Sequence, residues 1–322
     1  MKGTAIRRGE LNAFIEQASG VDKLFIGQTV LPVLGVTKRS AEYPVLRKAK
    51  GHLLTRDNTK RNSSGTYNQI TRKHEWDNYT CEDRGLEESV DDTKAEDMKD
   101  FFDLEVTTTK LVGRACKMDF ENTVVAKAYD ESVFAKVDAG VAYTVANIAT
   151  VDPAADFINA IAALVSRGQS ANTMVMSLAM WNYVRRSKLL QTYIYGSNND
   201  NVKVIRKADV ERIFGEESGG VMTMLIGAAV QSTSNRGKDT ITTAPIWPNT
   251  HVWIGNVQSG DFAAGGVGRT LSWEADTPNG LFLTETYRDD KTRADMVRVR
   301  SNSIEKIIDE DAGQLIKTNA NF

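Results

Sequence analysis

The longest helical pattern in the chain lies between residues 82 and 137. Apolar side chains recur there close to every third or fourth position, which places them on one face of an α-helix. The pattern predicts a long helical spine, and the β-branched run Thr107–Thr109 is expected to kink or tighten it. The residues that carry this spacing are Met98, Phe101, Phe102, Thr109, Val112, Ala115 and Val125.

Residues 150–258 alternate between helical and strand patterns. Asp152 and Pro153 are N-cap and first-turn residues, and Gly168 follows the apolar run FINAIAALV, so a helix is expected between them. LAMWNYVRRS and ADVERIFG predict further helices, whereas NTMVMS, MLIGAAVQ and THVWIGNV predict buried strands. The region therefore predicts a compact α/β unit, with YGSNNDN as a polar loop.

The two ends of the chain show extended patterns. Residues 1–39 form an arm, in which LFIGQTVLPVLGV reads as an extended segment lying on another surface rather than as a helix. In residues 268–322, TLSWEAD, LFLTETYRD and ADMVRVRSN alternate apolar and polar positions and predict antiparallel strands. SIEKIIDEDAGQLIK adds a last strand-like piece.

Residues 40–81 predict a long, mostly polar hairpin. Strands are expected near 43–56 and 66–80, with a turn at Asn62–Gly65. An isolated two-stranded hairpin is marginal in water, and this one has little apolar surface of its own. We therefore expect it to project and to dock on a partner surface.

Composition narrows the class of protein. The 322 residues are 41% hydrophobic and 25% charged with a net charge of −2, which indicates a globular chain without general attraction to nucleic acid or anionic lipid. The N-terminus does not resemble a secretory signal, and no apolar run is long enough to span a membrane. Cys81 and Cys116 show no disulfide-scaffold or metal-site spacing and are expected to be ordinary thiols.

Residues that could carry catalysis are scarce. The three histidines, His52, His74 and His251, lack metal-ligand spacing to one another or to cysteine. The segment GGVGRT (265–270) has arginine where a phosphate-binding loop has lysine. Cys116 falls inside the predicted long helix, where a buried thiol is expected. We therefore predict no enzyme activity, no cofactor and no metal.

Charge is distributed very unevenly. Residues 47–73 carry eight bases and one acid, a net charge of +7, whereas residues 82–105 carry eleven acids and three bases, a net charge of −8. Like charges within each segment repel one another, and this repulsion is relieved when a segment of opposite charge packs against it. That partner can come from the same chain or from another copy. The eight bases are Arg47, Lys48, Lys50, Arg56, Lys60, Arg61, Arg72 and Lys73. The acids singled out as their contacts are Glu87, Glu88, Asp91, Asp92, Glu96 and Asp97.

The charge of each segment also has a simpler explanation that needs no partner. Acids suit the first turns of a helix, and a basic loop can simply be solvated. A nucleic-acid arm is a further alternative, but such arms often interleave aromatic side chains, and only Tyr67 is available here.

The order of these features resembles the major capsid proteins of tailed bacteriophages, the Hong Kong 97-like capsid fold. The likeness covers roughly residues 21–318. It rests on FIGQTVLPVLGVTKRSAEYPVL, YTCEDRGLEESVDD, INAIAALVSRGQSANTMVMSLAMWNYVRRS and TYRDDKTRADMVRVRSNSIEKIIDEDAGQLI, taken as an ordered set. It implies an α+β chain with an N-terminal arm, an extended loop, a peripheral domain containing the spine helix and long strands, and an α/β axial domain.

The resemblance also implies boundaries and partners. The expected parts are an arm at 1–39, an extended loop at 40–81, a peripheral domain at 82–149 together with 268–322, and an axial domain at 150–267. Hexamers and pentamers of this chain would form an icosahedral virion shell around double-stranded DNA, assembled in the host cytoplasm. Portal, scaffolding and decoration proteins are the further expected partners, with scaffolding as a separate protein because the arm is short.

Contacts near the capsomer axis are expected in the YGSNNDN loop. Its residues are Tyr195, Gly196, Ser197, Asn198, Asn199, Asp200 and Asn201. An encapsulin-like nanocompartment is the nearest alternative function, and a nucleic-acid-binding protein that uses residues 47–73 is the second.

Overall fold

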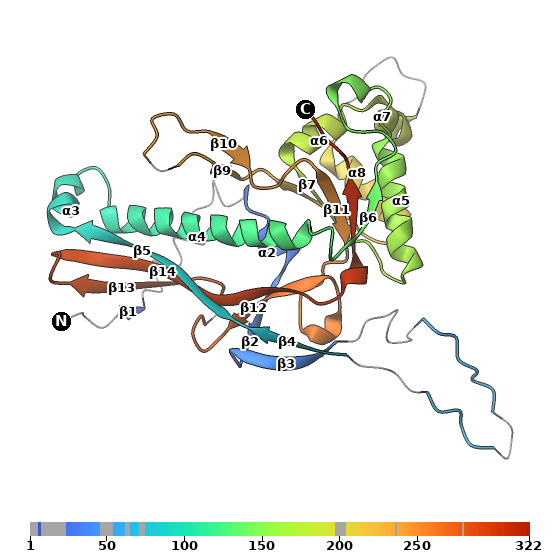
Figure 1. The fold of residues 1–322 in the computed structure, drawn as a ribbon, viewed down its shortest axis with the longest axis horizontal. Helices are drawn as coiled ribbons and strands as arrows, with labels where there is room; N and C mark the ends of the chain where they lie inside the picture. The colour runs from blue at the N-terminus through green and yellow to red at the C-terminus, as the bar shows by residue number, and fades with distance from the viewer. Residues whose placement is uncertain are drawn as a thin grey trace.

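Two sheets and one long helix form the framework of the molecule. The computed structural model describes residues 6–7, 24–45, 54–61, 65–70, 75–196, 204–235, 237–278 and 280–322. Helix α4 (Leu104–Ala128) runs along a six-stranded sheet toward a five-stranded sheet, and a loop extends away from both (Figure 1). The predicted α+β organisation is confirmed.

The six-stranded sheet is built around the long strand β14 (Ala294–Ile307). One edge of β14 pairs with β13 (Leu283–Asp289) and then with β12 (Gly268–Trp273), and the other edge pairs with β5 (Glu82–Asp91), all antiparallel. The short strand β1 (Ile6–Arg7) extends the sheet beside β13, and β2 (Val33–Val36) pairs with β12 in parallel. The strands predicted from period-two alternation are therefore confirmed.

Helix α4 lies across the face of β14 and β5. Asp103 caps its N-terminus by accepting the backbone N–H of Val106 at 3.1 Å. Val112 and Cys116 pack against Val299 of β14, which anchors the first half of the helix to the sheet. Its 25 residues correspond to about 37 Å at 1.5 Å per residue, so α4 spans most of the sheet.

The predicted helical region begins too early, because residues 82–91 form strand β5 and not helix. A seven-residue helix, α3 (Asp92–Met98), follows β5 and precedes α4. The run of residues 82–91 carries five acids but pairs along its whole length with the arginine-bearing strand β14. Opposite charges on neighbouring strands stabilise such a pair, and that partner is far away in sequence.

The five-stranded sheet has the order β6, β15, β11, β7, β8. It is covered on both faces, so its central strands are apolar at nearly every position. Val252 and Ile254 pack into one core with the surrounding helices, whereas Trp253 points to a second core shared with the end of α4. The strands are β6 (Ala135–Asp138), β15 (Gly313–Lys317), β11 (His251–Gly255), β7 (Thr173–Ser177) and β8 (Thr223–Gly227).

Most predicted elements of this unit are confirmed. Asp152 accepts the backbone N–H of Ala155 at the start of α5, and Gly168 follows its end with φ of 75°. MLIGAAVQ divides into β8 and β9, and α7 was not predicted. The helices are α5 (Pro153–Ser166), α6 (Leu178–Val184), α7 (Lys188–Tyr195) and α8 (Lys207–Glu217). Short 3-10 turns occur at Val145–Asn147, Phe262–Ala264 and Glu310–Ala312.

Two short segments, residues 135–138 and 313–317, form strands of the five-stranded sheet. Strand β15 leaves β14 through the turn at Glu310–Ala312 and pairs with β11 and β6. Residues 135–138 and 313–317 therefore pair within the five-stranded sheet. Pairing between β15 and β11 is a contact between distant segments, which local patterns do not encode.

Smaller elements complete the fold. Segment 24–36, predicted as extended, contains one helical turn, α2 (Gly27–Val30), before β2. Strands β3 (Ser40–Val45) and β4 (Glu75–Thr80) pair antiparallel, so the predicted hairpin strands at 43–56 and 66–80 are too long. A second hairpin joins β9 (Val230–Ser232) to β10 (Thr243–Pro245).

A buried carboxylate joins three parts of the molecule. Glu121 of α4 is 1% exposed and accepts the backbone N–H groups of Ile26 and Gly27 at 2.9 and 2.7 Å. Its Oε1 also accepts the indole N–H of the buried Trp247, which follows β10. Burial raises the pKa of Glu121, and these three donors oppose that rise. Residues 24–31, α4 and the five-stranded-sheet unit therefore meet at one side chain.

Replacing Glu121 with alanine tests this junction. The substitution leaves three buried donors without an acceptor, each worth ~1–3 kcal/mol, so the free energy of unfolding should fall by about 3 kcal/mol or more. Denaturant unfolding of unassembled chains measures the change. Glu88→Ala, which removes an exposed carboxylate, is the control and should change stability by less than about 0.5 kcal/mol. Equal effects of the two variants would contradict a special role for Glu121.

Candidate assembly surfaces

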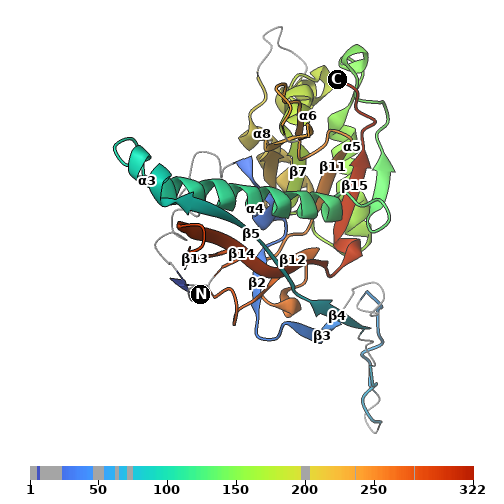
Figure 2. The same cartoon turned by 60° about the vertical axis from the view of Figure 1, so that its left-hand side comes forward.

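The projecting loop, defined by the described residues 54–61 and 65–70 between β3 and β4, is highly exposed. Its described residues, 54–61 and 65–70, contain neither helix nor strand, and nearly all of them are exposed. Figures 1 and 2 show these segments extending beyond β3 and β4, away from α4. The expectation that this region projects from the rest of the molecule is confirmed.

Local contacts hold the two described parts of the loop together. Asn68 donates to the carbonyl of Asn58 at 2.7 Å, and Arg61 donates to the carbonyl of Gly65 at 2.6 Å. The Arg61 guanidinium also lies 4.5 Å from the centre of the Tyr67 ring. The loop carries exposed apolar side chains as well, among them Leu54, Tyr67 and Ile70.

The structure describes three of the eight predicted loop bases. Arg56, Lys60 and Arg61 are exposed on the projecting loop. The other five, Arg47, Lys48, Lys50, Arg72 and Lys73, lie outside the described residues. The role of these bases as contacts between copies stays a prediction.

The predicted acidic set is divided between a strand and a short helix. Glu87 and Glu88 lie on β5, Asp91 caps α3 by accepting the backbone N–H groups of Thr93 and Lys94, and the remaining acids lie on α3. The prediction that all six mark the start of the spine helix is therefore wrong. The acids on α3 are Asp92, Glu96 and Asp97.

Several of these acids already have partners within the chain. Arg298 of β14 donates a hydrogen bond to Glu87 at 2.8 Å. Arg288 of β13 donates two hydrogen bonds of 2.6 Å to the carboxylate of Asp92. The Arg288 guanidinium lowers the pKa of Asp92. Part of the negative field of residues 82–105 is thus neutralised by arginines of the same sheet. Glu88, Glu96 and Asp97 are exposed, although Glu96 also lies 3.5 Å from the ammonium group of Lys99.

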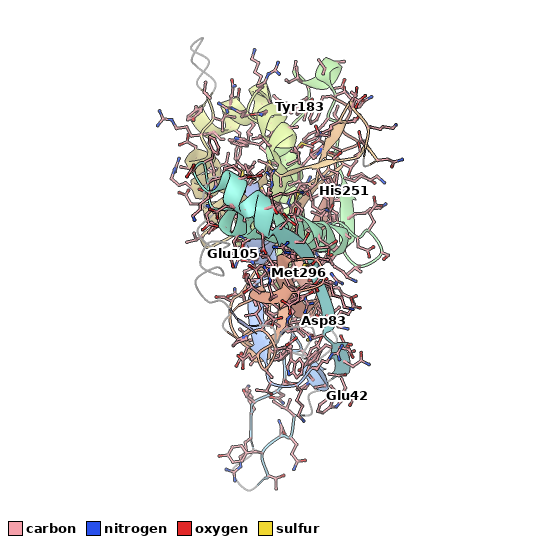
Figure 3. The ribbon with its side chains drawn as sticks, turned by 90° about the vertical axis from the view of Figure 1, so that its left-hand side faces the viewer. Glu42, Asp83, Glu105, Tyr183, His251 and Met296 are labelled. Atoms are coloured by element: carbon pink, nitrogen blue, oxygen red, sulfur yellow. The ribbon has the colours of Figure 1, made fainter. Side chains whose placement is uncertain are left out.

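Two residues of the predicted axial loop, Tyr195 and Gly196, are described. Tyr195 ends α7 and donates its hydroxyl to Asp209 of α8, and Gly196 follows with φ of 84°. The other members, Ser197 to Asn201, lie outside the described residues. In Figure 3, Tyr183 of the same unit and Glu42 at the base of the projecting loop mark opposite ends of the view.

Comparison with known proteins was made on sequence and on structure. No family model and no curated protein sequence matches the chain. A phage-related protein from Bordetella bronchiseptica RB50 has a TM-score of 0.68 with 17% identity, covering 98% of both chains. The capsid of cyanophage P-SCSP1u gives a TM-score of 0.54 with 11% identity, over 90% of this chain and 85% of that one. A virus-like particle from Pyrococcus furiosus gives 0.53 with 10% identity, over 96% and 98%.

The chain has the Hong Kong 97-like capsid fold. The similarity runs over nearly the whole chain rather than over one unit. At these identities the comparisons establish the fold, and the residues of each contact must be argued from this chain.

The candidate residues for chemistry have structural roles within this capsid fold. Arg269 of GGVGRT is fully buried and donates to the carbonyls of Gly260, Gly265 and Gly268 at 2.7–3.2 Å. The segment therefore presents carbonyl oxygens to a guanidinium and not N–H groups to a phosphate. Within the described ranges, no three His, Cys, Asp or Glu side chains are placed to hold a metal ion, and no helix is long and apolar enough to cross a membrane.

Both cysteine thiols and the one described histidine, His251, form hydrogen bonds within the chain. Cys81 and Cys116 are buried and donate to the carbonyls of Leu271 and Val299, and burial raises the pKa of each thiol to about 11. A thiol with such a pKa is a poor nucleophile near neutral pH. His251 bonds Glu131 at 3.0 Å, whereas His52 and His74 lie outside the described residues.

Limited trypsin digestion tests the exposure of the projecting loop. Cleavage of the purified chain should occur first after Arg56, Lys60 or Arg61, because a protease needs accessible backbone outside helices and sheets. Mass spectrometry of the fragments locates the cuts. Lys110 and Lys117 of α4 serve as internal controls and should remain uncut over the same time. A first cut within α4 or β14 would contradict the exposed loop.

Proposed function

We propose that this protein is the major capsid subunit of an icosahedral bacteriophage shell that encloses packaged double-stranded DNA. The observation that supports the proposal most is the match of nearly the whole chain to capsid structures. The proposed parts are the arm at 1–39, the extended loop at 40–81, the peripheral domain at 82–149 with 268–322, and the axial domain at 150–267. The two segments already shown to pair in the five-stranded sheet, residues 135–138 and 313–317, are proposed to work with the axial domain.

Assembly is the proposed mechanism. The projecting loop of one copy lies over the peripheral domain of its neighbour, and axial domains meet around five-fold and six-fold axes through the loop at 195–201. Each contact is weak alone, because exposed ion pairs contribute only ~0.2–1 kcal/mol. Multiple contacts per subunit close the shell through their combined effect. Portal, scaffolding and decoration proteins are the other proposed partners in the virion.

The geometry changes which acids are proposed as loop contacts. Glu87 and Asp92 already bond arginines of their own sheet, so they offer less to a neighbour. Glu88, Glu96 and Asp97 are exposed and are the preferred acidic contacts. On the loop, the exposed bases Arg56, Lys60 and Arg61 are the preferred partners, together with the bases flanking them in sequence.

The function itself is tested by electron microscopy of the purified native assembly, with a nuclease-protection assay on the same sample. Uniform icosahedral particles that protect DNA support the proposal. Shells that contain protein cargo and no genome would instead establish a nanocompartment, an alternative favoured by the similarity to the virus-like particle of Pyrococcus furiosus. A small oligomer that binds duplex DNA with steep salt dependence would overturn both.

Neutralising loop bases tests the mechanism. Replacing Arg47, Arg56, Lys60 and Arg61 with glutamine removes ~1–4 kcal/mol per loop contact at ~0.2–1 kcal/mol for each exposed pair. Shell formation should fail while the unassembled chain keeps its melting temperature, and light scattering with calorimetry measures both. A matched control replaces four exposed bases elsewhere, Lys127, Arg212, Lys238 and Lys291, and should still assemble. Normal shells from the loop variant would refute the mechanism.

A further inference from the structure

A groove of about 970 Å³ lies beside α6 in the unit built on the five-stranded sheet. Arg185 and Arg186 line it together with the amide side chain of Asn182, and no carboxylate side chain of the described residues does. Val145 and Val204 add apolar surface, and each is more than half exposed. The groove therefore offers cations, an amide donor and apolar surface, with no negative side chain to oppose an anion.

Stacked aromatic rings hold this groove in shape. Phe322 stacks on Tyr183 with ring centroids 4.7 Å apart, and Tyr183 stacks on Tyr143 at 5.6 Å. The Tyr183 hydroxyl also donates to the carbonyl of Thr144 at 2.7 Å. These contacts fix α6 against the neighbouring segment, so the end of α6 that carries the two arginines is positioned before any ligand binds.

Bases dominate this part of the chain. Residues 178–196 and 204–207 carry five bases and no acid, in a protein whose net charge is −2. Three of these bases, Arg185, Arg186 and Lys188, form no ion pair with the described residues. Like charges gathered without counter-charges repel one another, and an anionic partner relieves that repulsion. The five bases are Arg185, Arg186, Lys188, Arg206 and Lys207.

The anion that fits this surface best is a phosphodiester. A guanidinium group binds phosphate oxygens through two parallel hydrogen bonds, and Asn182 and Gln191 can donate further ones. Duplex DNA carries one negative charge per ~1.7 Å of its axis, so it can meet several of these bases at once. The deoxyribose rings between the phosphates match the exposed side chains of Val145 and Val204. The groove and the bases beside it therefore match the backbone of DNA.

We propose that Arg185, Arg186 and Lys188, named here the axial basic surface, bind phosphates of the double-stranded DNA enclosed by the shell. The inference rests on the proposed function and deepens it, because it names where the subunit meets the DNA. Figures 1 and 2 show α6 and the described residues of the projecting loop at different ends of the molecule. The two basic regions can therefore serve different partners, DNA and a neighbouring copy. Phosphate contacts carry no base information, so this binding is independent of DNA sequence.

Salt dependence of duplex DNA binding by unassembled chains tests the surface without a shell. Glutamine replaces all three bases of the axial basic surface, and the control variant carries glutamine at three exposed lysines elsewhere, Lys127, Lys238 and Lys291. The slope of log K against log salt should become shallower by about 2–3 in the first variant, at ~0.9 per phosphate contact, and stay at the wild-type value in the control. The single change Arg186→Gln, at an exposed side chain, should lower the slope by ~0.9 and keeps the test valid if the triple variant does not fold. Equal slopes in all chains overturn the proposal.

Arginine reactivity in shells identifies the partner. DNA-filled shells, and the same shells after release of their DNA, are treated briefly with phenylglyoxal and analysed by mass spectrometry. Arg185 or Arg186 should react about tenfold more slowly in the filled shells, because a hydrogen bond to a charged group contributes ~1.5–3 kcal/mol. Equal protection after DNA release would show that a neighbouring copy covers the arginines, and equal exposure in both samples would show no contact; either result overturns the proposal. Absence of shells would contradict the proposed function instead, and the salt slope would still decide whether this surface binds duplex DNA.

Discussion

The arrangement of the whole molecule depends on one buried carboxylate. Glu121 sits where α4, residues 26–27 and Trp247 converge, and it supplies acceptors to donors from all three. A buried carboxylate without donors would destabilise the fold, and buried N–H groups without an acceptor would do the same. The carboxylate of Glu121 and its three N–H donors therefore each need the other to be satisfied when buried. Because α4 is fixed at this point, the six-stranded sheet that carries it keeps its position relative to the five-stranded sheet.

Charge is satisfied in two different ways along the same sheet. On one part of it, Glu87 and Asp92 meet Arg298 and Arg288, so distant segments of one chain neutralise each other. On the face toward α4, Glu305 remains buried without a hydrogen bond to Oε2. The first arrangement places each carboxylate in direct hydrogen bonds with a guanidinium, whereas the second leaves Glu305 with a longer ion pair to Arg84 at 3.8 Å.

The long helix and the α/β unit were predictable because their signals are local. Helical spacing within 104–128 and the cap at Asp152 act over a few residues, so the sequence carries them directly. Strand β5 was mistaken for helix because its acids fit a helix start equally well. Only the arginines of β14, about two hundred residues away, select the extended form. The resemblance of the ordered features to a capsid subunit identified the fold despite that error.

The sequence by itself therefore determined the class of fold, the long helix, most elements of the α/β unit and the presence of a basic, projecting loop. Each of these follows from periodicity, capping or charge within a short window. The tertiary structure alone decided that residues 313–317 join the five-stranded sheet, that Glu121 is a junction, and that the buried Glu305 lies beside Arg84 of β5. Those features depend on contacts between segments far apart in the chain, and the free energy of such contacts leaves no signature in any local stretch of residues.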